Sequence, residues 1–199
     1  MRHRRRYRRS IGKRHLMAAL LGLYAYSLGC ETSPSPDETP DDSELPAAPS
    51  DGSLVDHDHW TLCPRQQTPF NDESTPETTC DPRGYGQEEG SFEVRTGYCP
   101  DLDVSQPNLQ EVHEGDLLEV IFYHMTLAPV DGEAEMHAAL AIGEEIVWEL
   151  QVPIPSPAKP YTVTFPSPVD APRGTPVFLH LHNHGYNSYN LQRFGLLVD

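Results

Sequence analysis

From Ser91 onward the chain consists of short apolar runs that are interrupted by proline and glycine. The runs are rich in Val, Ile, Leu, Phe, Tyr and Thr, which favours strands, and no helical period persists over three turns. Several short strands at such spacing predict an all-β fold, an antiparallel β-sandwich of about seven to eight strands. We expect these strands at Ser91–Tyr98, Leu117–Leu127, Ala134–Ile142, Ile146–Ile154, Tyr161–Phe165, Pro176–His184 and Tyr189–Val198.

Two segments of different character precede these strands. Residues 54–90 contain Pro, Gly, Asn, Asp and Thr throughout and show little period, so we expect an ordered, loop-rich wrap around the sandwich. Residues 30–53 are rich in Pro, Ser, Thr, Asp and Glu and have hardly any bulky apolar side chain. Such a segment cannot bury enough surface to offset its ordering entropy, which predicts a disordered acidic tether. The sandwich domain, with its wrap, is therefore expected over residues 54–199.

The first 29 residues have the layout of a secretory signal peptide. Eight basic residues lie within positions 1–14, and no acidic residue comes before Glu31. An apolar run follows at residues 16–28, shorter than the roughly 20 residues that a membrane-spanning helix needs. We therefore expect an exported protein whose signal ends at residue 29.

The end of this signal resembles the lipobox of bacterial prolipoproteins. The segment reads Ser27-Leu28-Gly29-Cys30, and it departs from the usual lipobox at Ser27, where a leucine is common. The resemblance implies cleavage before Cys30 and acylation of that cysteine with palmitate-type chains, which together make a stable membrane anchor. It favours the outer membrane, on its periplasmic face or at the cell surface.

The export route stays open between the general secretory route and the twin-arginine route. The segment Arg8-Arg9-Ser10-Ile11-Gly12-Lys13 is similar to a twin-arginine signal, although the region is so rich in arginine that a pair of them is expected anyway.

Charge narrows the range of functions. Removal of residues 1–29 leaves 6 basic residues against 30 acidic ones, a formal net charge of −24. This balance excludes a nucleic-acid binder, because such proteins carry basic patches. The sequence has no nucleophile elbow, zinc-protease motif or phosphate loop, so we expect no enzyme. The leading interpretation is an envelope lipoprotein that presents a binding or structural domain to an unknown ligand or envelope protein.

Three cysteines follow Cys30, and an oxidising compartment favours a disulfide between two of them. Cys63 and Cys80 flank a loop rich in Pro and Thr, so we expect this pair to be bridged. Cys99 would then remain as a buried thiol or a ligand.

Histidines suggest an alternative function in metal binding. His180 and His182 share one face of a predicted strand, opposite the apolar row that begins at Val177. His137 is expected on an outer face, whereas both rows around His124 are apolar. These four imidazoles would suit copper or zinc. A purely structural polar network around His180, His182 and Asn183 explains the same residues.

Aromatic side chains offer a third possibility. A ligand groove would present an exposed aromatic row, for which Trp60, Tyr186 and Tyr189 are the candidates. If all three were buried, this hypothesis would fail.

Overall fold

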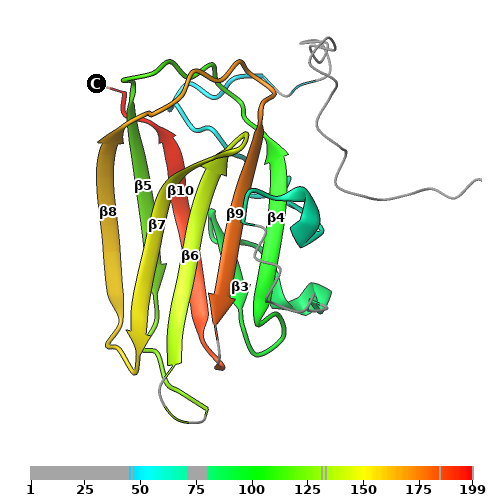
Figure 1. The fold of residues 1–199 in the computed structure, drawn as a ribbon, viewed down its shortest axis with the longest axis vertical. Coiled ribbons are helices and arrows are strands. Elements are labelled where there is room, and N and C mark those ends of the chain that lie inside the picture. The colour runs from blue at the N-terminus through cyan, green and yellow to red at the C-terminus, as the bar shows by residue number, and fades with distance from the viewer. Residues whose placement is uncertain are drawn as a thin grey trace, which may run out of the picture.

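Two five-stranded antiparallel sheets pack face to face in a computed structural model that describes residues 45, 47–70, 80–130, 132, 134–183 and 185–198. The β9 sheet and the β10 sheet, named here after their central strands, form the two layers seen in Figure 1. The β9 sheet has the order β1 (Thr61–Leu62), β4 (Asp101–Pro107), β9 (Pro176–Asn183), β6 (Ala134–Ile142) and β7 (Glu145–Ile154). The β10 sheet has the order β2 (Tyr85–Glu88), β3 (Ser91–Arg95), β10 (Ser188–Leu196), β5 (Leu117–His124) and β8 (Lys159–Pro166).

The predicted antiparallel β-sandwich is confirmed, with more strands than the seven or eight expected. All seven predicted strands are present with shifts of a few residues at their ends. The additional ones are β1, β2 and β4. Strand β4 escaped prediction because prolines flank it and its outward row, Asp101, Asp103 and Ser105, is polar. Two short 3-10 helices, η1 (Arg65–Gln67) and η2 (Pro82–Gly84), lie in the predicted wrap.

The core lies between the sheets and is formed by alternate residues of each strand. In β9 the expected inner row is buried, with Val177, Leu179 and Leu181 at most 1% exposed. Burial of such aliphatic side chains contributes about 1.5–3 kcal/mol each, so this row fixes which face of β9 points outward.

The loops fall at two opposite ends of the sandwich. The first described residues and the C-terminus lie at one end, called here the tether end (Figure 1). There Ser53 forms a bridge with Gly195, so the packed domain begins slightly before the predicted Leu54. The other end, called here the loop end, carries the β3–β4, β5–β6, β7–β8 and β9–β10 connections. From Gly195 to Ser188, strand β10 covers about 23 Å between the two ends.

The predicted disulfide between Cys63 and Cys80 is wrong, because Cys80 is bonded to Cys99. The Cα atoms of Cys80 and Cys99 are 4.4 Å apart. The turn after β3 carries Cys99 against the segment that precedes η2, whereas Cys63 packs with Ala141 and Phe178 outside the β9 sheet. The position of Cys63 and Cys80 on either side of a loop therefore did not predict which cysteines the fold brings together.

The predicted signal peptide and Cys30 lie outside the described residues. Across the part of the chain that is described, no helix is long and apolar enough to cross a membrane.

Candidate functional site

The structure separates the four predicted metal-binding histidines into two groups. His180 and His137 lie together on the outer face of the β9 sheet, with ring centroids 5.1 Å apart, and His182 is the register partner of His137. His124 belongs to the other sheet and points inward, where its Nδ1 contacts the carbonyl of Met125 at 2.7 Å. The predicted set of four is therefore wrong in His124, because an inward residue of β5 cannot reach the outer face of the β9 sheet.

Two aspartates, which sequence reasoning missed, complete the histidine cluster. The antiparallel register places Asp101 opposite His182 and Asp103 opposite His180. Asp103 Oδ1 contacts His180 Nδ1 at 2.8 Å, and Asp101 Oδ2 lies 3.4 Å from His182 Nδ1. We call these four residues the Asp/His grid. They occupy two successive outward-facing positions on each of the neighbouring strands β4 and β9.

Arg65 of η1 bridges the two carboxylates of the grid. Its Nε donates to Asp103 Oδ2 at 2.8 Å, and its Nη2 donates to Asp101 Oδ1. Every carboxylate oxygen of the grid thus faces a nitrogen of Arg65 or of a histidine. Because the carboxylates are almost fully buried, the folded state tolerates them only if each oxygen has such a partner.

The electrostatics of the grid favour the ionised form of Asp101. Burial alone would raise the pKa of Asp101, but the hydrogen bond from His182 and the charge of Arg65 hold that pKa below its usual value. Burial would likewise lower the pKa of Arg65, yet its contacts with Asp103 and Asp101 raise it. The guanidinium of Arg65 and the carboxylate of Asp101 therefore stabilise each other's charged forms.

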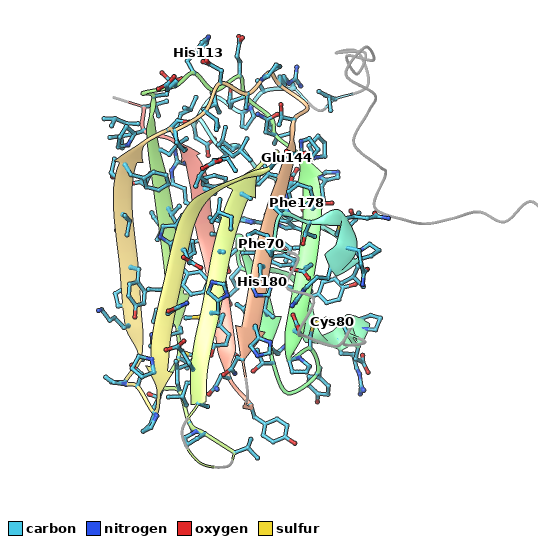
Figure 2. All side chains as sticks on the ribbon, in the orientation of Figure 1. Phe70, Cys80, His113, Glu144, Phe178 and His180 are labelled. Carbon is cyan, nitrogen blue, oxygen red and sulfur yellow. A yellow bond between two sulfur atoms is a disulfide. The ribbon has the colours of Figure 1, made fainter. Side chains whose placement is uncertain are left out.

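Aromatic and aliphatic groups cover the grid from outside. The ring of Phe70 lies 5.3 Å from that of His180 and packs beside Phe178, as the labelled side chains in Figure 2 show. Phe70 belongs to the predicted wrap, so the wrap lies over His180.

His137 sits at the edge of this cover. Its Nε2 lies 2.7 Å from Glu149 Oε1 on β7. Burial and the neighbouring His180 lower the pKa of His137, although Glu149 acts in the opposite direction. His137 therefore favours its neutral form in the folded protein.

The predicted groove of aromatic residues does not form. Trp60 is buried against Phe92 with ring centroids 5.6 Å apart, and Tyr189 is buried against Phe122. Tyr189 is part of the core because it is an inward position of β10, and Trp60, which precedes β1, packs onto the core from the wrap. Only Tyr186 is exposed, with 78% of its surface accessible.

Tyr186 is nevertheless held in a defined position at the loop end. A Cβ placed on Gly97 would lie 2.5 Å from Cδ1 of Tyr186, so the ring rests directly on the glycine. The adjacent Tyr98 is 47% exposed, and the guanidinium of Arg83 lies 4.9 Å from the centre of its ring. Two exposed phenol rings thus occupy one corner of the loop end.

Buried hydrogen bonds tie the loops that carry Tyr186. The hydroxyl of Thr96 donates to the carbonyl of Gly185 at 2.6 Å and accepts from Asn183 Nδ2 at 2.8 Å and from the N–H of Asn187 at 3.0 Å. Asn187 Oδ1 also accepts from the N–H of Ala128 at 3.0 Å, which adds the β5–β6 connection. We call these residues the loop tie. Asn183 belongs here, and the predicted network that joined it to His180 is corrected, because successive strand residues point to opposite faces.

A third feature is an acidic hollow of about 500 Å³ on the outer face of the β10 sheet. Its lining includes Glu88, Glu93, Tyr123 and Asn190. Burial and the neighbouring Glu88 raise the pKa of Glu93.

Comparison with known proteins found no matching family model and no matching curated protein. Among solved structures, one described as "CBM4 structure and function" is 12% identical, with 57% of this chain and 75% of that chain covered and a TM-score of 0.36. A structure of TmCBM61 in complex with β-1,4-galactotriose is 7% identical over 78% of this chain and 100% of that chain, with a TM-score of 0.40. The K2 cleaved adhesin domain of Lys-gingipain is 16% identical over 80% of this chain and 95% of that chain, with a TM-score of 0.31.

Proposed function

We propose that this chain is an exported lipoprotein, anchored through Cys30, whose β-sandwich is a non-catalytic binding module that holds its ligand at the loop end. The observation that carries the proposal is Tyr186, an aromatic ring that is largely exposed and yet seated on Gly97. A rigid ring loses little conformational freedom when it binds, so such rings are frequent at binding sites.

The two ends of the sandwich support this assignment. The chain enters the domain at the tether end, where Ser53 pairs with Gly195, and Tyr186 lies at the opposite end. A tether that begins at Cys30 would therefore leave the loop end on the far side of the domain from the membrane, where a ligand has access.

The ligand that fits best is a neutral polysaccharide. Tyrosine presents an apolar face and a polar tip, which suits a sugar ring that has C–H groups on its face and hydroxyls at its rim. The charge of Arg83, which lies on the ring of Tyr98, is already paired, because Arg83 holds Asp81 through contacts of 2.7 and 3.0 Å. A neutral ligand also avoids repulsion by the acidic chain.

Affinity electrophoresis of the full chain in detergent, through gels that contain soluble β-glucan, mannan or galactan, tests the proposal. We expect at least one of these neutral polysaccharides to retard the wild type and Tyr186→Ala to abolish the retardation. Leu117→Ala is the control, since Leu117 is 49% exposed at the tether end, and it should be retarded as the wild type is. No retardation of the wild type, or equal retardation of Tyr186→Ala, would refute this ligand class. Retardation only by a protein partner would refute it as well.

The anchor is tested separately with Cys30→Ser. We expect the wild type to partition into the detergent phase and the variant to move to the aqueous phase, since two or more acyl chains are needed for stable anchoring. Unchanged partitioning of the variant would contradict lipidation at Cys30.

A further inference from the structure

We propose that the Asp/His grid is a transition-metal site, with Zn²⁺ as its natural occupant, in which the side chain of Arg65 takes the place of the metal in the metal-free chain. This inference goes beyond ligand binding at the loop end and involves none of its residues.

The positions of the ligand atoms come from the strand register. Residues opposite each other on antiparallel strands have Cβ atoms about 4.5–5.5 Å apart, so two opposite pairs enclose a small square of side chains. One ligand atom from each of Asp101, Asp103 and His180 already lies within 4.8 Å of the other two. Two ligand atoms on a tetrahedral Zn²⁺ are about 3.4 Å apart, given bond lengths of about 2.0–2.2 Å. Small side-chain rotations would therefore close the site.

His182 can supply the fourth ligand. Its Nδ1 is 3.4 Å from Asp101 Oδ2, and its side chain is on the same face as that of His180. Two imidazoles and two carboxylates form a donor set of nitrogen and oxygen that Zn²⁺ accepts.

Arg65 indicates that the grid attracts a cation at its centre. The guanidinium contacts one oxygen of each aspartate, which is where a metal ion would lie. A divalent ion adds one more positive charge than Arg65 does and would neutralise both carboxylates. Metal ligands must be deprotonated to bind, so the affinity is expected to weaken in acid.

The wrap supplies a route for the exchange. Arg65 belongs to a helix of three residues that is attached to the sheet face by side chains and not by a full strand. Withdrawal of this one side chain frees the carboxylate oxygens that it contacts, while Phe70 can stay over His180. Zn²⁺ binding is thus expected to exchange the contacts of Arg65 for metal–ligand bonds.

Titration with Co²⁺, followed by competition with Zn²⁺, tests the proposal on the full chain in detergent after removal of metal with EDTA. We expect one Co²⁺ per chain, with the visible absorption of a tetrahedral site, and displacement by Zn²⁺. Arg65→Gln should bind at least about tenfold tighter, because the metal no longer competes with charged hydrogen bonds. Asp103→Asn should lose the site. Zn²⁺ should also raise the melting temperature of Arg65→Gln more than that of the wild type.

A matched control is available at the tether end. His113 is exposed and lies 3.5 Å from Asp116 and 3.7 Å from Glu111, so it is a histidine between acids without a grid. His113→Gln should leave the Co²⁺ titration unchanged. If Arg65→Gln does not fold without metal, Arg65→Lys replaces it, since lysine keeps the positive charge but lacks the planar fork of donors with which the guanidinium holds the two carboxylates. Absence of stoichiometric Co²⁺ from both the wild type and the folded Arg65 variant would overturn the proposal. Binding that survives Asp103→Asn or that is lost in His113→Gln would overturn it too.

Discussion

The Asp/His grid and the loop tie are both buried polar networks, but they are built from different groups and hold different parts of the chain. The grid joins two aspartates and two histidines on the face of a sheet, and the charged Arg65 closes it from the wrap. The loop tie joins a hydroxyl, amides and backbone groups of three connections, with Thr96 at its centre. Ionised groups are expensive to bury, whereas neutral ones need only a hydrogen bond each.

This difference explains what each network can do. The grid fastens the wrap to the sheet, so any ligand of the grid must compete with Arg65. The loop tie takes its hydrogen bonds from its own side chains and backbone groups, without a charged residue, and it leaves Tyr186 exposed on the turn that it holds. A charged network therefore suits exchange with a cation, and a neutral one suits the support of a binding surface.

Arg65→Ala should produce the largest loss of stability. It leaves two buried carboxylates without their cation, and breaking a buried ion pair in this way costs about 3–5 kcal/mol. Urea unfolding without added metal measures this loss. The control is Arg83→Ala, because Arg83 forms an exposed ion pair with Asp81 and its removal should barely shift the urea midpoint. Equal losses of stability in the two variants would contradict the expectation that the buried ion pairs of Arg65 matter more than the exposed pair of Arg83.

Thr96→Val should have a smaller effect of the same kind. The valine keeps the shape of threonine but leaves the donors of Asn183 and Asn187 unpaired, which costs about 1–3 kcal/mol. The same unfolding measurement ranks the two networks. A loss of stability larger than that of Arg65→Ala would show that the loop tie stabilises the fold more than the Asp/His grid does.

His137→Gln should change the pH dependence of stability. The pKa of His137 is lowered by burial and by His180, so the unfolded chain takes up this proton at a higher pH than the folded one. Stability is therefore expected to fall as the pH drops below about 6.5. Melting temperatures between pH 7.5 and 5 should fall less steeply for His137→Gln than for the wild type. Parallel curves would show that His137 makes no contribution.

The fold was predictable because its strands repeat a simple alternation. Strand β6 was correctly bounded at Ala134–Ile142, since its inward positions are uniformly apolar. The grid was only half predictable for the same reason. His180 and His182 were visible as a pair on one face, but the Asp101 and Asp103 that oppose them lie in β4, the strand that was missed. The spacing of Asp101 and Asp103, two positions apart and so on one face of a strand, was the available signal.

Other features depend on tertiary contacts that no local pattern contains. Tyr186 and Tyr189 are three positions apart, yet the first lies in a turn and the second inside β10. The partner of Cys80 likewise depends on where the turn after β3 is placed. Arg65 could not be assigned to the grid, since η1 reaches it only after the wrap has folded onto the sheet.

A single methyl group on Gly97 tests whether the seated ring of Tyr186 forms the binding surface. Gly97→Ala adds one methyl group where Tyr186 Cδ1 would be 2.5 Å away, and the exposed ring can swing out of its way. We expect Gly97→Ala to keep the melting temperature of the wild type. We expect it to lose the retardation by neutral polysaccharide that the wild type and Leu117→Ala show. Retardation of Gly97→Ala equal to that of the wild type would contradict a binding surface built on the seated ring of Tyr186.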